Sequence, residues 1–351
     1  MPEIDLRSDT VTKPTPEMRR AMYEAEVGDD VYGEDPTINR LQELAAELTG
    51  KEAALLVTSG TMGNQVAVMA QTQKGDEVIL EADAHMFYYE VGGLACLSGV
   101  QTRTVSAPHG ILTAENIRAM LRNPNDIHNP RTALICLENT HNRAGGTCYP
   151  VNVLAEIKEM AQQSGVPVHV DGARIFNASV ALGVPVRVLA GYCDTMMFCL
   201  AKGLGAPVGS MLVGSKAFID RARKCRKMLG GGMRQAGIIA AAGIVALTSM
   251  VGRLAEDHAH ARMLGEACLE MGWGIDLSTV QTNIVVFDVM PFNVSAAAVQ
   301  KLLAEEGVKV SQFGEFRLRM VTHYGITRQD IDYTIAALNR VAKKLRQDSK
   351  R

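Results

Sequence analysis

The chain has 351 residues, with 36 Lys and Arg against 38 Asp and Glu, so its formal net charge is −2. This balance gives no electrostatic reason to expect binding to nucleic acid or to a membrane surface. The hydrophobic fraction of 47% suffices for a sizeable core, and the length predicts about two domains. The first ten residues carry no apolar stretch, so we expect no signal peptide. Seven scattered cysteines without a CxxC pair favour reduced thiols in the cytoplasm over a disulfide framework or a zinc site.

The first 50 residues begin with a polar, extended stretch, DLRSDTVT at Asp5–Thr12, which is followed by a short helical pattern. A second helix is predicted to start at Pro36 and to continue through Leu48. Asp35 is placed as its N-cap, and Gly50 as its stop.

Apolar, strand-like runs then alternate with helical patterns as far as about residue 213. This alternation predicts an α/β domain with a mainly parallel sheet. Helical patterns such as Met62–Ala70 and Val153–Gln163 lie between most of the strands. The predicted strands are Ala53–Val57, Val78–Leu80, Arg103–Val105, Ala133–Leu137, Val166–Val170, Thr195–Leu200 and Gly209–Val213.

The pattern changes after about residue 215, where long helices come first and short strands follow. We therefore predict a large domain at residues 1–251 and a smaller α+β domain at residues 252–351, with the N-terminal arm packing against the smaller one. The apolar run Ala236–Leu247 indicates a buried helix or a subunit contact. The predicted elements are helices at Lys216–Met228, Gln235–Met250, Arg253–Met271 and Val294–Glu305, strands at Asn283–Asp288, Val308–Gln312 and Phe316–Val321, and a last amphipathic helix with Ile331, Ile335, Leu338, Val341 and Leu345 on one stripe.

Lys202 follows the apolar run Thr195–Leu200 and precedes Gly203 and Gly205, so it is predicted to lie in the loop at the end of a buried strand. A lysine partly removed from water there suits a Schiff-base enzyme, which needs a nucleophilic amine. The alternative is an ordinary lysine whose head group reaches solvent.

The stretch TSGTMGN at Thr58–Asn64 follows a predicted strand and opens a helix. Small residues and the free N–H groups of a helix N-terminus suit a phosphate. The stretch is neither a Walker A loop nor a GxGxxG pattern, and a plain tight turn is the alternative.

A second hydrophobic strand ends in Asp171, and Arg174 follows three residues later. A carboxylate at the end of a buried strand needs a cationic partner. In a pyridoxal phosphate enzyme that partner is the pyridine nitrogen of the cofactor. A structural Asp171–Arg174 ion pair is the alternative.

The chain order of phosphate loop, strand-end Asp171 and strand-end Lys202 matches the layout of fold-type I pyridoxal phosphate enzymes, and together the three signals favour that interpretation. His85 follows a strand and could stack on the cofactor ring. His128 and His141 also lie in loops, and loops at the carboxyl ends of strands are where α/β sheets bind ligands. Alternation places Arg317 and Arg319 on one face of a strand, so the pattern alone does not decide which of them would bind a substrate carboxylate.

Several long stretches resemble the low-specificity L-threonine aldolases, fold-type I (aspartate aminotransferase-like) lyases. The stretches are DLRSDTVT, VGDDVYGEDP, SGTMGN, CLENTHN, HVDGARIFNA, KGLGAPVGS, RKMLGGGMRQAG and RMVTH, in that order along most of the chain. The resemblance implies cleavage of L-threonine, L-allo-threonine and other β-hydroxy-α-amino acids to glycine and an aldehyde, with pyridoxal 5'-phosphate as cofactor. It also implies a homotetramer with active sites at dimer interfaces. We see no ligand cluster for a metal.

Carried over by residue, the resemblance implies Lys202 as the Schiff-base lysine. It selects Arg319 over Arg317, because the family arginine precedes Val-Thr-His by two positions. Either His128 or His85 is expected to take the β-hydroxyl proton, and Tyr89 to shape the side-chain pocket. Ala201 stands where many relatives have Ser. The remaining expected roles are ring stacking by His85, the pyridine nitrogen for Asp171, the phenolic oxygen for Arg174, the phosphate for Ser59, Gly60, Thr61 and, across a subunit interface, Arg234, and the substrate carboxylate for Ser8 and Arg319.

Overall fold

The strands predicted before residue 215 lie in one seven-stranded sheet in the computed structural model, which describes residues 3–348. The order is β2-β8-β7-β6-β5-β3-β4, and β8 alone among these strands is antiparallel to its neighbours β2 and β7. The mainly parallel sheet confirms the prediction. The strands are β2 (Ala53–Val57), β3 (Glu77–Glu81), β4 (Gln101–Val105), β5 (Thr132–Glu138), β6 (Val168–Asp171), β7 (Thr195–Cys199) and β8 (Ser210–Gly214).

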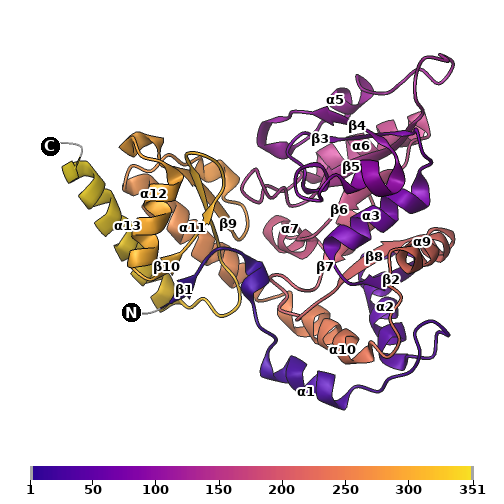
Figure 1. The fold of residues 1–351 in the computed structure, drawn as a ribbon, viewed down its shortest axis with the longest axis horizontal. Helices are drawn as coiled ribbons and strands as arrows, with labels where there is room; N and C mark the ends of the chain where they lie inside the picture. Colours follow the sequence, from indigo (N-terminus) through magenta and orange to yellow (C-terminus); the bar gives the residue numbers. More distant parts are fainter. Residues whose placement is uncertain (1–2, 349–351) are drawn as a thin grey trace.

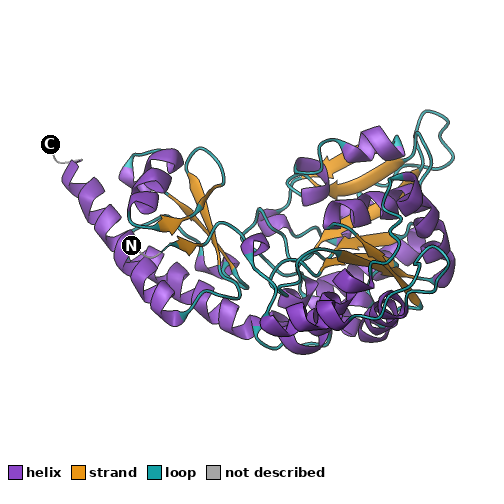
Figure 2. Cartoon of the chain, turned by 60° about the horizontal axis from the view of Figure 1, so that its bottom comes forward, coloured by secondary structure: helices purple, strands orange, loops and turns teal. Residues whose placement is uncertain are grey.

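Helices cover both faces of this sheet (Figures 1 and 2). On β7, Met196 and Phe198 pack in one core cluster, whereas Met197 and Cys199 pack in another on the opposite face. Burial on both faces explains why the strands read as continuous apolar runs. The helices are α2 (Pro36–Thr49), α3 (Gly60–Gln71), α4 (His85–Tyr88), α5 (Ala114–Arg118), α6 (Val151–Ser164), α7 (Ile175–Leu182), α8 (Val186–Ala190) and α9 (Lys216–Met228).

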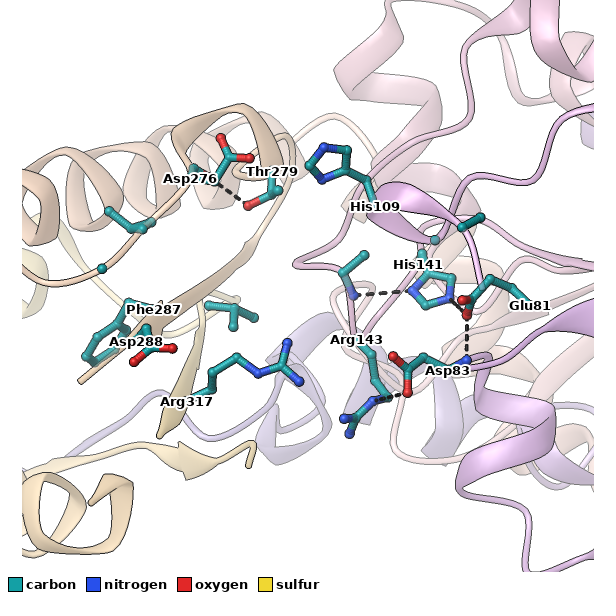
Figure 3. A pocket seen from close by; sticks show the side chains of 16 residues that line it. Glu81, Asp83, His109, His141, Arg143, Asp276, Thr279, Phe287, Asp288 and Arg317 are labelled. Atoms are coloured by element: carbon teal, nitrogen blue, oxygen red, sulfur yellow. Dashed lines mark hydrogen bonds and ion pairs between the residues drawn. The ribbon is translucent and has the colours of Figure 1, made fainter. Parts of the chain in front are cut away.

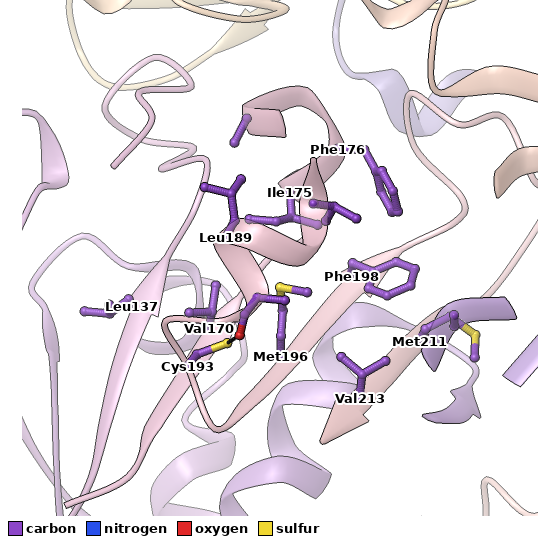
Figure 4. Close-up of a cluster of buried hydrophobic side chains, with 14 of the residues drawn as sticks. Leu137, Val170, Ile175, Phe176, Leu189, Cys193, Met196, Phe198, Met211 and Val213 are labelled. Atoms are coloured by element: carbon purple, nitrogen blue, oxygen red, sulfur yellow. Dashed lines mark hydrogen bonds between the residues drawn. The ribbon is translucent and has the colours of Figure 1, made fainter. Parts of the chain in front are cut away.

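The larger core cluster lies between the sheet and helices α2, α6, α7 and α8. Figure 4 shows its centre, where Phe176 of α7 meets Phe198 of β7 edge-on with ring centroids 5.3 Å apart. Such aromatic pairs add stabilisation beyond their buried area. Because these side chains fix α7 against β6 and β7, they also hold the ends of those strands in place.

Helix α2 shows how local sequence sets an element. The Asp35 side chain accepts a hydrogen bond from the N–H of Ile38 at 2.9 Å, and Pro36 occupies the first turn. Gly50 ends the helix in the left-handed region at φ 66°, where other residues are strained. The predicted cap and stop are both confirmed.

The C-terminal part forms a smaller lobe with its own antiparallel sheet, β11-β12-β9, and its own core. The predicted strand Val308–Gln312 divides into two strands, because its first half pairs with the N-terminal strand and its second half with β12. The elements are β1 (Ile4–Asp5), β9 (Ile284–Asp288), β10 (Val308–Lys309), β11 (Ser311–Gln312), β12 (Arg317–Val321), α11 (Leu254–Glu270), α12 (Ala296–Glu305) and α13 (Arg328–Asp348).

The N-terminal arm joins the two lobes. Ile4 and Leu6 pack in the core of the smaller lobe, and β1 pairs with β10 in parallel. The chain then runs to α1 (Pro16–Glu24), which packs on α10 (Gly237–Val245) of the larger lobe (Figure 1). The arm therefore packs against the smaller lobe as expected, and the division at residues 251 and 252 stays a proposal.

The predicted helix Gln235–Met250 is α10 followed by a π-helical turn, η4 (Ala246–Met250). Within residues 3–348, no single helix is long and apolar enough to cross a membrane; 237–250 and 254–270, bent by 69°, reach that length and composition only as a pair. The other short turns are η1 (Asp9–Val11), η2 (Leu94–Ser98), η3 (Pro108–Gly110), η5 (Leu277–Thr279) and η6 (Met290–Phe292).

Candidate active site

A cavity of about 320 Å³ lies at the carboxyl ends of the parallel strands, where both lobes and the N-terminal arm meet. In open α/β sheets this edge is the usual place for a ligand. The cavity brings together residues that are far apart in the sequence, most of which were predicted as site residues. Its lining is Ser8, Thr10, His85, Tyr89, Asn142, Arg174, Lys202, Ser311, Gln312, Phe313 and Arg319.

Lys202 lies in the turn just after β7, as predicted, and its side chain lines the cavity. Its backbone oxygen accepts hydrogen bonds from the Thr12 hydroxyl at 3.0 Å and from the N–H of Gly205 at 2.9 Å. Within residues 3–348, the Lys202 ammonium has no hydrogen bond and no ion pair. The backbone is therefore fixed while the amine is available for chemistry.

Asp171 ends β6 and is almost fully buried. One carboxylate oxygen accepts from the Asn64 amide at 2.8 Å and the other from the N–H of Ala173 at 3.0 Å. The alternative ion pair with Arg174 is not formed, because Arg174 binds another carboxylate. Within residues 3–348, Asp171 therefore has no ion pair with an arginine or a lysine.

Arg174 forms a bidentate pair with Asp9, with Nε and Nη2 each 2.7 Å from a carboxylate oxygen. Both side chains are buried, and Asn283 of the smaller lobe donates to the same carboxylate at 3.2 Å. Burial alone would raise the pKa of Asp9, but the Arg174 guanidinium holds that pKa well below its usual range. Sequence reasoning missed Asp9, although it stands in the polar DLRSDTVT stretch.

His85 begins α4 and is held at two points. Its backbone N–H donates to Glu138, and its ring Nδ1 lies 3.0 Å from an oxygen of Glu90. The Tyr89 ring lies 5.4 Å away between centroids. Burial would lower the pKa of His85, but Glu90, Asp171 and Glu138 together raise it above its ordinary value.

Arg319 of β12 reaches the cavity from the smaller lobe. Its Nη1 donates to Asn142 Oδ1 at 2.7 Å, its Nη2 donates to the Arg7 carbonyl at 3.0 Å, and its guanidinium stacks on Phe313. Burial lowers the pKa of Arg319 to about 10. A half-buried guanidinium that has no carboxylate partner within residues 3–348 favours binding of an anion.

Arg317 lies on the same face of β12, as predicted, but lines a neighbouring cavity of about 410 Å³ (Figure 3). His141 also belongs to this second cavity, where its Nε2 is 3.0 Å from Glu81. Arg143 lies at the same cavity, pairs with Asp83, and donates to the Tyr89 hydroxyl at 3.0 Å. Of the two arginines that the strand pattern left open, Arg319 is the one beside Lys202.

The N-terminus of α3 carries the predicted phosphate loop. The Ser59 hydroxyl caps the helix by accepting from the N–H of Met62 at 3.1 Å. The N–H groups of Gly60 and Thr61 belong to the first turn, which has no acceptors within the helix. A Cβ on Gly60 would lie 3.0 Å from the sulfur of Cys199, so glycine lets the helix start close to the end of β7.

Comparison with known proteins identifies the family. Residues 5–290 match the family model described as beta-eliminating lyase. The chain is 44% identical over 355 aligned positions to low-specificity L-threonine aldolase 1 of Arabidopsis thaliana, which covers 100% of this chain and 99% of the relative. The chain belongs to the low-specificity L-threonine aldolase family.

Two solved structures share the fold of this aldolase-family chain. A Leishmania major threonine aldolase is 18% identical, with a TM-score of 0.83 over 97% of this chain and 99% of that chain. A structure of SPT with a PLP internal aldimine is 19% identical, with a TM-score of 0.78 over 98% of this chain and 88% of that chain. The predicted fold-type I architecture is confirmed.

The site of this aldolase-family chain fits pyridoxal 5'-phosphate. Lys202 lines the cavity with an amine that has no ion pair within residues 3–348, and Asp171 has a carboxylate oxygen within 4.8 Å of a ring nitrogen of His85, which also lines it. The capped N-terminus of α3 begins beside Cys199 at the end of β7. His85, Glu90 and Asp171 also place three ligand atoms within 4.8 Å of one another, which is close enough for a metal ion and was not foreseen from the sequence. The two carboxylates of this trio already accept hydrogen bonds from the side-chain amides of Asn64 and Gln65.

Six predicted site residues are outside the lining of this cavity. Four of them are Ser59, Gly60 and Thr61 at the start of α3 and Asp171 at the end of β6. The other two lie on the surface. His128 is exposed in the loop before β5, where its backbone N–H donates to Asp126. Arg234 is exposed and pairs with Asp29 at 2.9 Å. The role expected for Arg234 requires a second subunit, and the roles of both residues stay predictions.

We predict that Asp9→Asn lowers the free energy of unfolding by about 3–5 kcal/mol, because it leaves the buried Arg174 charge without its partner. The stability that Asp9 contributes is present above an ordinary carboxyl pKa of about 3.9 and is lost as pH falls toward its lowered folded value. The difference in the free energy of unfolding between wild type and variant therefore becomes smaller as the pH is lowered. Urea unfolding at several pH values measures this difference.

The matched control is Asp332→Asn, which removes an exposed carboxylate paired with Arg328 on α13. We expect a change below about 0.5 kcal/mol for this control. Equal losses in the two variants would show that the Asp9–Arg174 pair contributes no more than a surface pair.

Proposed function

We propose that this chain cleaves L-threonine and L-allo-threonine, and other β-hydroxy-α-amino acids, to glycine and an aldehyde, with acetaldehyde as the product from threonine. The observation that carries the proposal is the convergence of Lys202, His85 and Arg319 on one cavity, with the buried Asp171 close to His85. Membership of the low-specificity L-threonine aldolase family supports it.

The proposed cofactor is pyridoxal 5'-phosphate, which when bound supplies an electron sink for the pair released by Cα–Cβ cleavage. Lys202 would hold its aldehyde carbon through the free amine. The residues proposed for its other groups are Asp171 for the pyridine nitrogen, Arg174 for the phenolic oxygen, Ser59, Gly60 and Thr61 for the phosphate, and His85 for the ring face.

Arg319 and the groups around it are proposed to orient the substrate. We infer that its guanidinium and the Ser8 hydroxyl bind the α-carboxylate, since both line the cavity and Arg319 lacks a carboxylate partner within residues 3–348. Asn142 and the Arg7 carbonyl hold the guanidinium in place. Fixing the carboxylate fixes the direction of the Cα–Cβ bond, which is how a positioned clamp lowers a barrier. Tyr89 would border the β-substituent.

The proton of the β-hydroxyl must move as the Cα–Cβ bond breaks. His85 lines the cavity and is the candidate that this protomer offers, while His128 stays a candidate for a site shared with another subunit. An imidazole suits the task because it exchanges a proton near neutral pH.

The function is tested by incubating purified, cofactor-loaded protein with L-threonine and with L-allo-threonine. Release of acetaldehyde and glycine in equal amounts is expected. The second candidate is β-elimination, which the family model's description favours, and it would instead release a keto acid and ammonia. Transamination would release a keto acid without free ammonia. A site that binds the cofactor but releases none of these products would instead favour a binding protein.

The proposed assembly is a homotetramer with active sites at dimer interfaces. Exposed apolar side chains lie on α1, on α10 and in the loop between α1 and α2, among them Tyr23, Tyr32 and Ile238. Light scattering of the purified protein tests the assembly.

We also propose a cytoplasmic location and roles in threonine catabolism and glycine formation. All seven cysteines are unpaired, which supports a reducing compartment.

A further inference from the structure

Glu90 is a buried carboxylate to which the sequence assigned no role. It follows α4 directly, and its side chain is fully buried. Three donors converge on it: the Asn64 amide at 2.8 Å, the Gln65 amide at 2.7 Å and the His85 ring nitrogen Nδ1 at 3.0 Å. A buried carboxylate is costly unless it is hydrogen-bonded in this way, so the arrangement constrains every group around it.

The orientation of Asn64 is set by its neighbours. Its Nδ2 lies 2.8 Å from Glu90 and 2.8 Å from Asp171, and both of these groups accept only. Its Oδ1 must therefore accept from His169, whose Nε2 is 3.2 Å away. Burial lowers the pKa of His169 to about 4, so that ring is neutral and carries its hydrogen on Nε2.

The far side of His169 agrees with this assignment. Its Nδ1 lies 3.0 Å from the Thr195 hydroxyl oxygen, which also accepts from the Gln71 amide at 3.1 Å. The Thr195 hydrogen is thus free to point at Nδ1. The network from Thr195 to Glu90 has one consistent set of hydrogen positions, which leaves Glu90 as an acceptor toward His85.

We propose that Glu90 is a positioning residue for His85. The Glu90 carboxylate accepts a hydrogen bond from Nδ1–H of the His85 ring and so leaves the other ring nitrogen, Nε2, for the substrate. The proposal rests on the proposed function, because Nε2 would meet the β-hydroxyl only in an aldolase site. His85 lines the cavity, and its Nε2 has no hydrogen bond to residues 3–348. Orientation of an imidazole by a buried carboxylate is the arrangement that makes its second nitrogen an effective base.

The charges around His85 raise its pKa, which is consistent with its hydrogen bond to Glu90. Carboxylates face it from three elements, and the hydrogen bond to Glu90 together with the nearby charges outweighs burial, so the pKa of His85 lies above its ordinary value. Cations that line the same cavity would act on this pKa in the other direction. The facing groups are Glu90 after α4, Glu138 at the end of β5, Asp171 at the end of β6, Tyr89, Lys202, Arg174 and Arg319.

The direct test is ¹⁵N NMR of histidine-labelled protein, with and without pyridoxal 5'-phosphate, in which His85→Asn identifies one signal among the eight histidines. In wild type we expect Nδ1 of His85 to keep its hydrogen across the titration while Nε2 gains and loses its proton. In Glu90→Gln we expect the midpoint of that titration to fall by about one pH unit or more. A neutral His85 with its hydrogen on Nε2 in wild type would overturn the proposal, even if the variant does not fold.

The matched control is Glu77→Gln. Glu77 is also a buried carboxylate, but it lies at the amino end of β3 and pairs with Arg122, away from the cavity. We expect this control to lower stability and to leave the His85 titration unchanged. An equal shift of the midpoint in both variants, or no shift in Glu90→Gln, would contradict the proposal.

The kinetic test follows kcat against pH for Glu90→Gln. We expect kcat to fall by about 10²-fold, within the range of a general-base contribution, and the acid limb of the profile to move to lower pH. A fall in kcat with an unmoved limb would indicate a purely structural role and overturn the proposal. If wild type released no aldehyde, the proposed function would fail, while the NMR result would still decide whether Glu90 positions His85.

Discussion

Lys202→Ala is expected to lower kcat for L-threonine by at least about 10⁴-fold, because within residues 3–348 no other lysine lines the cavity to hold the cofactor and accept it back after release of the product. The variant should also lose the visible absorbance of the bound cofactor. Borohydride should fix the cofactor to the peptide that contains Lys202 in wild type and leave the variant unlabelled. Mass spectrometry of the digested protein reads out that labelling independently of turnover.

The control for Lys202 is Lys216→Ala at the start of α9. The Lys216 side chain is 77% exposed and pairs only loosely with Asp220. We expect this variant to keep wild-type kcat, absorbance and labelling. Borohydride labelling that persisted in Lys202→Ala would assign the covalent bond to another lysine and refute the role proposed here.

The strands of the larger lobe were predictable because each is a short apolar run bounded by turn residues. Burial on both faces leaves such runs uninterrupted, as the split of Met196 and Met197 between opposite clusters illustrates. The two ends of α2 were equally local, since Asp35 and Pro36 act within its first turn and Gly50 acts directly after its last. The sheet order and the direction of β8 depend on pairing across the whole chain, and no local pattern reports them.

Site residues were predictable where a charged residue stands at or just after the end of an apolar strand, as Asp171 and Lys202 do. They were not predictable where a side chain contacts another that is distant in the sequence. Asp9 binds Arg174 across 165 positions, and Asn64 binds Asp171 across 107. The three-dimensional fold determines such long-range pairs. A polar residue within a polar stretch of sequence does not indicate which distant side chain it will contact. The division of Val308–Gln312 into two strands has the same cause, because its first partner is the N-terminal strand β1.

The choice between two arginines on one strand shows what three-dimensional placement adds. Arg317 and Arg319 share a face of β12, yet they line different cavities. Residues two apart on a strand are separated by roughly 6–7 Å. This distance is enough for the two side chains to reach neighbouring cavities. Asn142 and Phe313 contact Arg319, which fixes its guanidinium at the cavity of Lys202.

Arg319→Lys is therefore expected to raise KM for L-threonine by about 10²-fold, because lysine cannot reproduce the two parallel hydrogen bonds of a guanidinium to a carboxylate. The same substitution at Arg317 is the matched control, with equal chemistry on the same strand face, and should leave KM within about twofold of wild type. Steady-state kinetics with L-threonine and L-allo-threonine measure both. Since the carboxylate is common to the two substrates, the increase should be the same for each. An increase confined to Arg317→Lys would move the substrate to the neighbouring cavity, and an increase for only one substrate would show that Arg319 contacts the β-substituent instead of the carboxylate.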